Sequence, residues 1–194
     1  MFLVFWVCLH GLGTQIFLFC MELNPELFQV SNTEERHGHE NLTYGSLTTK
    51  GMLTMVHTIR QIVPNTSSIE GMDLGCGDGE LLFHLQEHLE GSNWYGVELC
   101  GSRVEKQRRP VFIWEGDMLE EPLHSYTILH ADNLCLEEAI ADRLEHKIAC
   151  EFTGLYITYR TPENLLFLQK AIYLTTIPTE TTWYLHPIKY YYIP

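Results

Sequence analysis

The stretch Gly71-Met-Asp-Leu-Gly-Cys-Gly-Asp-Gly79 decides the fold of this chain. Residues 69–74 predict a short buried strand, and the glycines that follow permit a tight turn with positive φ and close approach of a ligand. From Glu80 onward, leucines recur at helical spacing. Trp94-Tyr-Gly-Val-Glu98 then predicts a second strand that ends in an acid. Strand, glycine turn, helix and strand in this order are typical of the first βαβ unit of a Rossmann-like sheet, whose ligand lies beyond the carboxyl ends of the strands.

The acids around the turn indicate which nucleoside ligand fits. A dinucleotide site favours the spacing GxGxxG, so that a pyrophosphate meets the helix N-terminus. Here Asp73 and Asp78 flank the glycines, and their carboxylates repel a pyrophosphate but suit an ammonium group. Glu98 can accept hydrogen bonds from both hydroxyls of a ribose. S-adenosylmethionine (SAM) carries an ammonium and a ribose, and the stretch resembles motif I of the class I SAM-dependent methyltransferases, with Gly96-Val-Glu98 resembling their second motif.

The rest of the pattern completes a sheet of this kind. We expect a Rossmann-like α/β fold with a mostly parallel seven-stranded sheet, a C-terminal antiparallel hairpin and helices on both faces. Further strands are expected at residues 111–114, 126–130 and 154–159, and in a hairpin made of residues 172–177, 181–184 and 188–193. Helices are expected at residues 49–63, 137–144 and 162–171. The acid of Gly116-Asp-Met118 can accept from an adenine amino group, while Met118 can lie against the adenine face.

Composition limits the partners of the chain. Its 194 residues suit one domain, and a formal net charge of -13 argues against a large phosphate-binding surface. No proline follows the fourth strand at Asp132-Asn-Leu-Cys135, where enzymes that methylate nucleobase amines carry Pro-Pro-aromatic. Strong nucleic-acid binding is therefore not expected. The six cysteines form no CxxC pair, so we expect a reducing compartment and no metal site.

The first 20 residues are almost entirely apolar and divide the chain into residues 1–20 and a methyltransferase domain of residues 21–194. Their length is near that of a membrane-spanning helix, which allows membrane association. They contain no Lys or Arg to begin a signal peptide. An over-extended start, with Met21 as the functional beginning, is the alternative.

A more specific resemblance extends from Tyr44 to the end of the chain. The motifs that carry it are Tyr44-Gly45, Asp73-Leu-Gly-Cys-Gly77, Tyr95-Gly-Val-Glu98, Gly116-Asp-Met118, Asn133-Leu-Cys-Leu136 and Trp183-Tyr-Leu-His-Pro-Ile-Lys-Tyr-Tyr191. Together they resemble the catalytic core of the disruptor-of-telomeric-silencing family. That family consists of non-SET methyltransferases that modify a lysine in the globular core of a nucleosomal histone.

This resemblance implies a SAM-dependent protein-lysine methyltransferase that acts on a histone or nucleosome in the nucleus. Asn133 would lie near the transferring methyl, and Trp183 and Tyr190 would line a lysine channel. The residues that would bind SAM are Tyr44, Asp73, Gly75, Cys76, Gly77, Glu98, Asp117, Met118 and Asn133. The alternatives are a cytoplasmic or membrane-anchored enzyme for a small molecule or a non-histone protein, and a non-catalytic subunit that keeps the SAM fold.

Overall fold

A computed structural model of the chain describes residues 45–194. The predicted SAM ligand Tyr44 and the apolar residues 1–20 lie outside these described residues. The helices are α1 (Thr49–Ile62), α2 (Glu80–His88), α3 (Gly101–Val104), α4 (Glu138–Glu151) and α5 (Leu165–Lys170). The strands are β1 (Glu70–Leu74), β2 (Asn93–Glu98), β3 (Phe112–Glu115), β4 (Ile128–Ala131), β5 (Gly154–Thr158), β6 (Ile172–Glu180) and β7 (Leu185–Ile193). Within residues 45–194, no helix has the length and apolar character needed to cross a bilayer.

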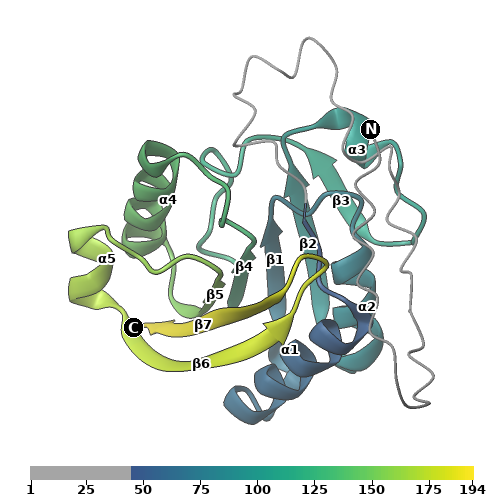
Figure 1. The fold of residues 1–194 in the computed structure, drawn as a ribbon, viewed down its shortest axis with the longest axis horizontal. Coiled ribbons are helices and arrows are strands. Elements are labelled where there is room, and N and C mark those ends of the chain that lie inside the picture. Colours follow the sequence, from purple (N-terminus) through teal and green to yellow (C-terminus); the bar gives the residue numbers. More distant parts are fainter. Residues whose placement is uncertain (1–44) are drawn as a thin grey trace, which may run out of the picture.

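The strands form one seven-stranded sheet in the order β3-β2-β1-β4-β5-β7-β6 (Figure 1). Strands β1 to β5 pair in parallel, and β7 runs antiparallel to β5 and to β6. The predicted mostly parallel sheet with a C-terminal antiparallel hairpin is therefore confirmed.

One detail of the predicted hairpin is wrong, because residues 181–184 form the turn between β6 and β7 and not a strand. The Thr181 hydroxyl accepts hydrogen bonds from the backbone amides of Trp183 and Tyr184, at 3.2 and 3.1 Å. A threonine side chain that captures amides two and three residues further on favours a turn over an extended strand.

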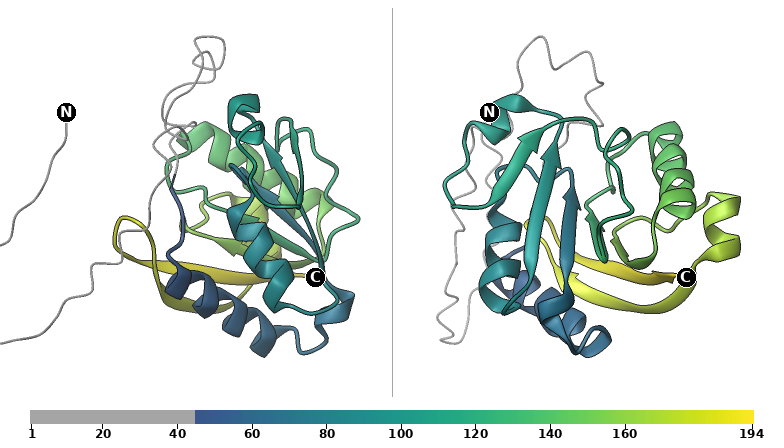
Figure 2. Two further views of the ribbon diagram at one scale, coloured as in Figure 1. Left: turned by 90° about the vertical axis from the view of Figure 1, so that its right-hand side faces the viewer. Right: turned by 180° about the vertical axis from the view of Figure 1, so that it is seen from behind.

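Helices cover both faces of the sheet (Figure 2), and buried side chains form a separate core on each face. On one face, Ile59 of α1 and the leucines of α2 pack with Ile157 of β5. On the other face, Ile148 of α4 packs with Tyr156, the neighbouring residue of β5. Successive side chains of a strand point to opposite faces, so β5 supplies both cores. The two buried layers hold the strand ends in place at the edge of the sheet.

The glycine turn between β1 and α2 has the predicted conformation. Gly75, Gly77 and Gly79 have φ of +88, +59 and +79°, which only glycine adopts readily. The Gly75 amide donates to the carbonyl oxygen of Val97 at 2.8 Å, so the turn is tied to the end of β2. The turn and the end of β2 therefore form one edge of the same site.

Candidate functional site

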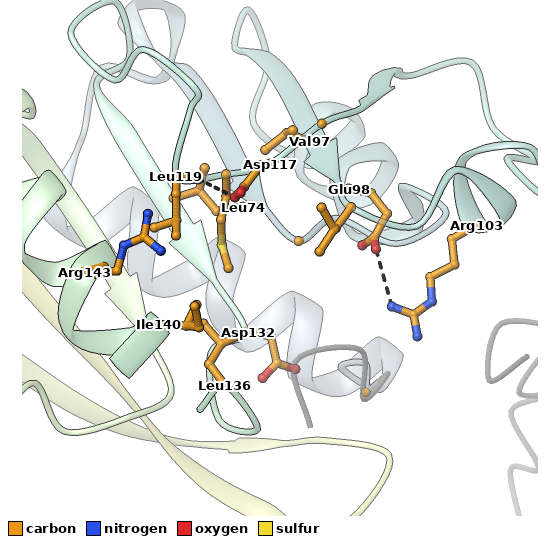
Figure 3. Close-up of a pocket in the computed structure, with 15 residues that line it drawn as sticks. Leu74, Val97, Glu98, Arg103, Asp117, Leu119, Asp132, Leu136, Ile140 and Arg143 are labelled. Atoms are coloured by element: carbon orange, nitrogen blue, oxygen red, sulfur yellow. Dashed lines mark hydrogen bonds and ion pairs between the residues drawn. The ribbon is translucent and has the colours of Figure 1, made fainter. Parts of the chain in front are cut away.

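A cavity lies beyond the carboxyl ends of β1, β2 and β3 (Figure 3), and we call it the first cavity. Its lining brings together Gly75, Glu98, Asp117 and Met118, four of the residues predicted to hold SAM. Ligands of open α/β sheets bind at this edge. The roles of the individual residues remain predictions, but the fold places them around one space.

Glu98 is buried at the end of β2, where its carboxylate is held by three donors. Oε2 accepts from the Gly77 amide at 2.9 Å, and Oε1 accepts from the Cys100 amide at 2.9 Å. Arg103 Nη1 lies 3.4 Å from the same Oε1, and Figure 3 marks this ion pair with a dashed line. A carboxylate offers about four lone-pair positions. The acid therefore ties the glycine turn to α3 and keeps capacity for a further donor from the cavity.

Asp117 and Met118 follow the end of β3 on the neighbouring side of the first cavity. The Asp117 Oδ1 accepts from the Leu119 amide at 2.8 Å, which fixes the turn that carries both residues. Asp117 is exposed and Met118 is partly buried. Leu136, from the loop before α4, adds apolar surface to the lining. An acid beside apolar surface suits a flat heterocycle that carries an exocyclic amino group.

A second, smaller cavity adjoins the first and shares Gly75 and Asp132 with it. Asp73 from β1 and His130 from β4 both line it, and the Asp73 Oδ1 to His130 Nδ1 distance is 2.6 Å. Asp78 and Glu80 add two further carboxylates to its lining. The cavity has the acidic character predicted for an ammonium site, but a histidine already bonds the Asp73 carboxylate.

A third cavity lies at the tip of the β6–β7 hairpin. It is lined by Trp183, Tyr184 and His186, and again by Asp132. A Cβ built on Gly45 would lie 3.2 Å from the Trp183 ring and 3.5 Å from Asp132 Oδ2, so these two side chains converge on Gly45. Trp183 is thus the predicted catalytic residue that the fold brings to a cavity.

Asp132 lines all three cavities and stands where they meet. Its side chain is exposed because it faces these open spaces. The protein packed around it nevertheless raises the pKa of its carboxyl, while His130 and His186 act in the opposite direction. Solvent in the open cavities screens part of this effect, so the raised pKa makes Asp132 a modestly stronger base than an ordinary aspartate.

Asp73, His130, Tyr159 and His186 form a connected series of side-chain contacts across four neighbouring strands. His130 bonds Asp73 on one side, and its Nε2 lies 3.4 Å from the hydroxyl of Tyr159, just past the end of β5. The Tyr159 ring stacks on His186 of β7, with centroids 5.7 Å apart. Burial raises the pKa of Tyr159 well above its usual value, and the nearby Asp132 and Asp73 carboxylates add to this effect. Its phenol therefore remains protonated.

The remaining predicted site residues do not face the first cavity. Asn133 and Tyr190 line none of the three cavities. The Asn133 Oδ1 accepts from Thr158, Tyr159 and Arg160 at 2.9 to 3.2 Å.

Tyr190 is fully buried in the core on the α1 side of the sheet. Gly77 contributes its amide to Glu98 and lines none of the three cavities. Cys76 lines the second cavity, where burial and then the Asp73 charge raise the pKa of its thiol well above the usual value. That thiol therefore remains neutral.

Sequence reasoning missed Asp132, His130 and Tyr159 as cavity residues. His130 and Asp132 stand at the end of the fourth strand, on the edge where ligands bind, so their position was the available signal. Arg103 gave no such signal, because the basic run at residues 103–109 is better explained from the sequence as a solvated helix end, whereas the structure buries Arg103 beside Glu98.

Comparison with known proteins agrees with this arrangement. The family described as methionine biosynthesis protein MetW matches residues 54–149, a range that begins within α1 and ends within α4. No curated protein matches the chain.

Several solved structures share the fold. Magnesium protoporphyrin IX methyltransferase from Synechocystis PCC 6803 with bound SAM is 14% identical, with a TM-score of 0.60 over 86% of this chain and 86% of its own. A mutant of MtNAS in complex with S-adenosylmethionine is 14% identical, with a TM-score of 0.56 over 74% of this chain and 62% of its own. TrmN from Thermus thermophilus is 12% identical, with a TM-score of 0.55 over 72% of this chain and 48% of its own. The chain has the class I SAM-dependent methyltransferase fold.

Proposed function

We propose that this protein is a SAM-dependent methyltransferase that acts on a small molecule or on a protein other than a histone. The observation that carries the proposal is the first cavity, in which Glu98 and Asp117 follow neighbouring strands beside the glycine turn. Two of the solved structures with this fold hold SAM, according to their descriptions.

The donors and acceptors of the first two cavities suit the parts of SAM. Glu98 has remaining acceptor capacity for a ribose hydroxyl, Asp117 can accept from an adenine amino group, and Asp78 supplies a carboxylate for an ammonium. A Cβ built on Gly75 would meet no atom within 4 Å, although the residue lines both cavities. The backbone there is open to a ligand, and a side chain would occupy the ligand's space.

SAM, when bound, supplies an electrophilic methyl group on a sulfonium. The protein then has to position the acceptor and remove its proton. Asp132 borders the cofactor side and the aromatic third cavity, so its carboxylate is the group we assign to accept a proton from an acceptor N–H or O–H. Trp183 and Tyr184 would hold the apolar part of the acceptor, and their ring faces also suit a cationic one.

A histone lysine is the second candidate acceptor, and the aromatic rings of Trp183 and Tyr184 beside Asp132 support it. Asn133 and Tyr190 give it no further support, because neither lines a cavity. The formal net charge of -13 disfavours contact with the DNA of a nucleosome. The structural relative whose description names a porphyrin substrate is a small-molecule enzyme. A nuclear location belongs to the histone candidate alone.

Two measurements test the proposal. Calorimetry with SAM and with its demethylated product gives cofactor binding, which we expect to be saturable, and its absence would overturn the proposed function. Tritiated SAM is then incubated with nucleosomes, with free histones and with a whole-cell extract separated into protein and small-molecule fractions. We expect label in the small-molecule fraction or on non-histone protein. Label confined to histones would replace the proposed acceptor by the second candidate.

A further inference from the structure

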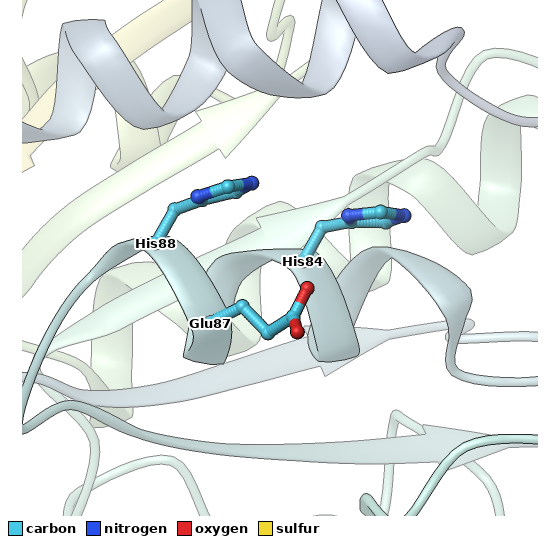
Figure 4. A group of neighbouring side chains, drawn as sticks. All are labelled: His84, Glu87 and His88. Atoms are coloured by element: carbon cyan, nitrogen blue, oxygen red, sulfur yellow. The ribbon is translucent and has the colours of Figure 1, made fainter.

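Three side chains able to ligate a metal ion gather on one face of α2, as Figure 4 shows: His84, Glu87 and His88. One ligand atom from each lies within 4.8 Å of the other two. None of the three lines the cavities described above. The expectation of no metal site rested on the cysteines, whereas this group consists of two imidazoles and a carboxylate at positions i, i+4 and i+3, which share a helix face.

The helix brings the three ligand atoms to within 4.8 Å of one another, somewhat farther apart than around a bound ion. Zinc bonds imidazole nitrogen at about 2.0–2.1 Å, so two ligand atoms of one tetrahedral ion lie roughly 3.3 Å apart. The rings of His84 and His88 lie nearly parallel, with an interplanar angle of 13° and centroids 6.2 Å apart. Because the lone pair of an imidazole lies in the ring plane, one ring has to turn before both can reach a common ion. The χ2 torsion of histidine has a broad distribution of angles, so such a rotation costs little energy.

Two carboxylates, Glu80 and Glu87, and two arginines, Arg60 and Arg109, surround the cluster. Glu80 Oε1 lies 3.3 Å from His84 Nε2, and a carboxylate beside a ligating imidazole fixes its tautomer and orientation. With Nε2–H donating to Glu80, Nδ1 of His84 is left to bind an ion. Arg109 pairs with Glu80 at 3.2 Å, and Arg60 donates to the backbone carbonyl oxygen of the last helical residue. Glu87 therefore supplies the negative charge at the ion itself.

We propose that His84, Glu87 and His88 bind one divalent transition-metal ion through two nitrogens and one oxygen. Zinc accepts this ligand set and completes its tetrahedron with water. The ion would stabilise the protein and take no part in the reaction. His84 and His88 lie four and eight residues after Glu80, or about 6 and 12 Å along the helix from the end next to the glycine turn, and none of the three ligands lines a cavity described above. An ion that binds only the folded chain raises its stability by mass action.

Zinc chloride titrated into the metal-free full chain tests this site, with calorimetry and thermal unfolding measured in the same buffer. Every protein would carry Cys150→Ala, because Cys150 Sγ lies 3.7 Å from His146 Nε2 on α4 and this pair offers zinc a competing site. We expect the parent protein to bind zinc and to unfold at a higher temperature with the metal. His84→Gln and His88→Gln should each weaken binding by about 10- to 100-fold or more, because losing a group that merely orients a ligand already costs that much.

His57→Gln is the matched control, since His57 is an exposed histidine on α1 that bonds Gln61, and it should bind zinc as the parent does. Circular dichroism of the metal-free proteins shows whether each variant is folded. If His84→Gln is not folded, Glu87→Gln at an exposed position carries the test. Zinc affinity and stoichiometry in the folded variants equal to those of the parent would overturn the proposal.

Discussion

Replacing Glu98 by glutamine tests the central assignment of the first cavity. The carboxylate accepts from the amides of Gly77 and Cys100 and contacts Arg103. Glutamine keeps the shape and one oxygen, so one of the two amides would face an NH₂ group. A buried donor left unsatisfied costs about 1–3 kcal/mol of folding stability. Losing a charged acceptor for the ribose costs about 1.5–3 kcal/mol of binding, which corresponds to about a 10- to 150-fold weaker Kd.

The two effects need separate assays. Urea unfolding of the ligand-free protein gives the stability change, and calorimetry with SAM, at a temperature where both proteins are folded, gives the affinity change. Glu115→Gln is the matched control. Glu115 pairs in register with Glu98 on β3 but is exposed and lines none of the cavities. If the Glu98→Gln variant binds SAM as tightly as the wild type, the ribose assignment is refuted, even if the variant is less stable.

Three further changes follow from the same geometry. Gly75→Ala should weaken SAM binding in calorimetry, because the new Cβ would occupy open space at a residue that lines both cavities, while the φ of +88° should separately cost about 1–2 kcal/mol of folding stability; wild-type affinity would show that the ligand lies elsewhere. Asn133→Ala should lower the free energy of unfolding in urea by about 1–3 kcal/mol, since three donors lose the acceptor Oδ1; unchanged stability would contradict the structural role. Asp132→Asn should slow methyl transfer by about 10²-fold or more, and its melting temperature shows whether the variant is folded. In the wild type, the transfer rate should fall as the pH drops through the raised pKa of Asp132, where the carboxylate gains a proton, and a rate that stays flat would argue against Asp132 as the base.

Much of the fold could be read from local patterns. The glycine turn needs three residues with positive φ, which few sequences provide, and Gly75, Gly77 and Gly79 provide them. The helix at α1 begins where Thr48 accepts from the Gly51 amide and ends just before Pro64. The turn and the helix ends depend on residues that are close together in the sequence, so they can be predicted without knowing the tertiary structure.

The polar network could not be predicted in this way. Asp73 and His130 are far apart in sequence and meet because β1 and β4 are neighbours in register. Tyr159 and His186 meet because β7 inserts next to β5. A histidine in a strand is equally compatible with a packed interior, with solvent and with a site. Only the order of the strands decides which residues face each other.

Asn133 illustrates how a residue can matter to a site without facing it. Its Oδ1 accepts hydrogen bonds from the Thr158 hydroxyl and from the backbone amides of Tyr159 and Arg160. These bonds fix the loop after β4 to the end of β5. Asp132 is the preceding residue, and its carboxylate stands where the three cavities meet. Loss of these bonds would free the loop that carries Asp132, so under the proposed function we infer that Asn133 acts on the acceptor through Asp132. The two roles predict different results for Asn133→Ala. A direct contact with the acceptor lowers the transfer rate in a protein of unchanged stability, whereas positioning through the loop lowers stability and rate together.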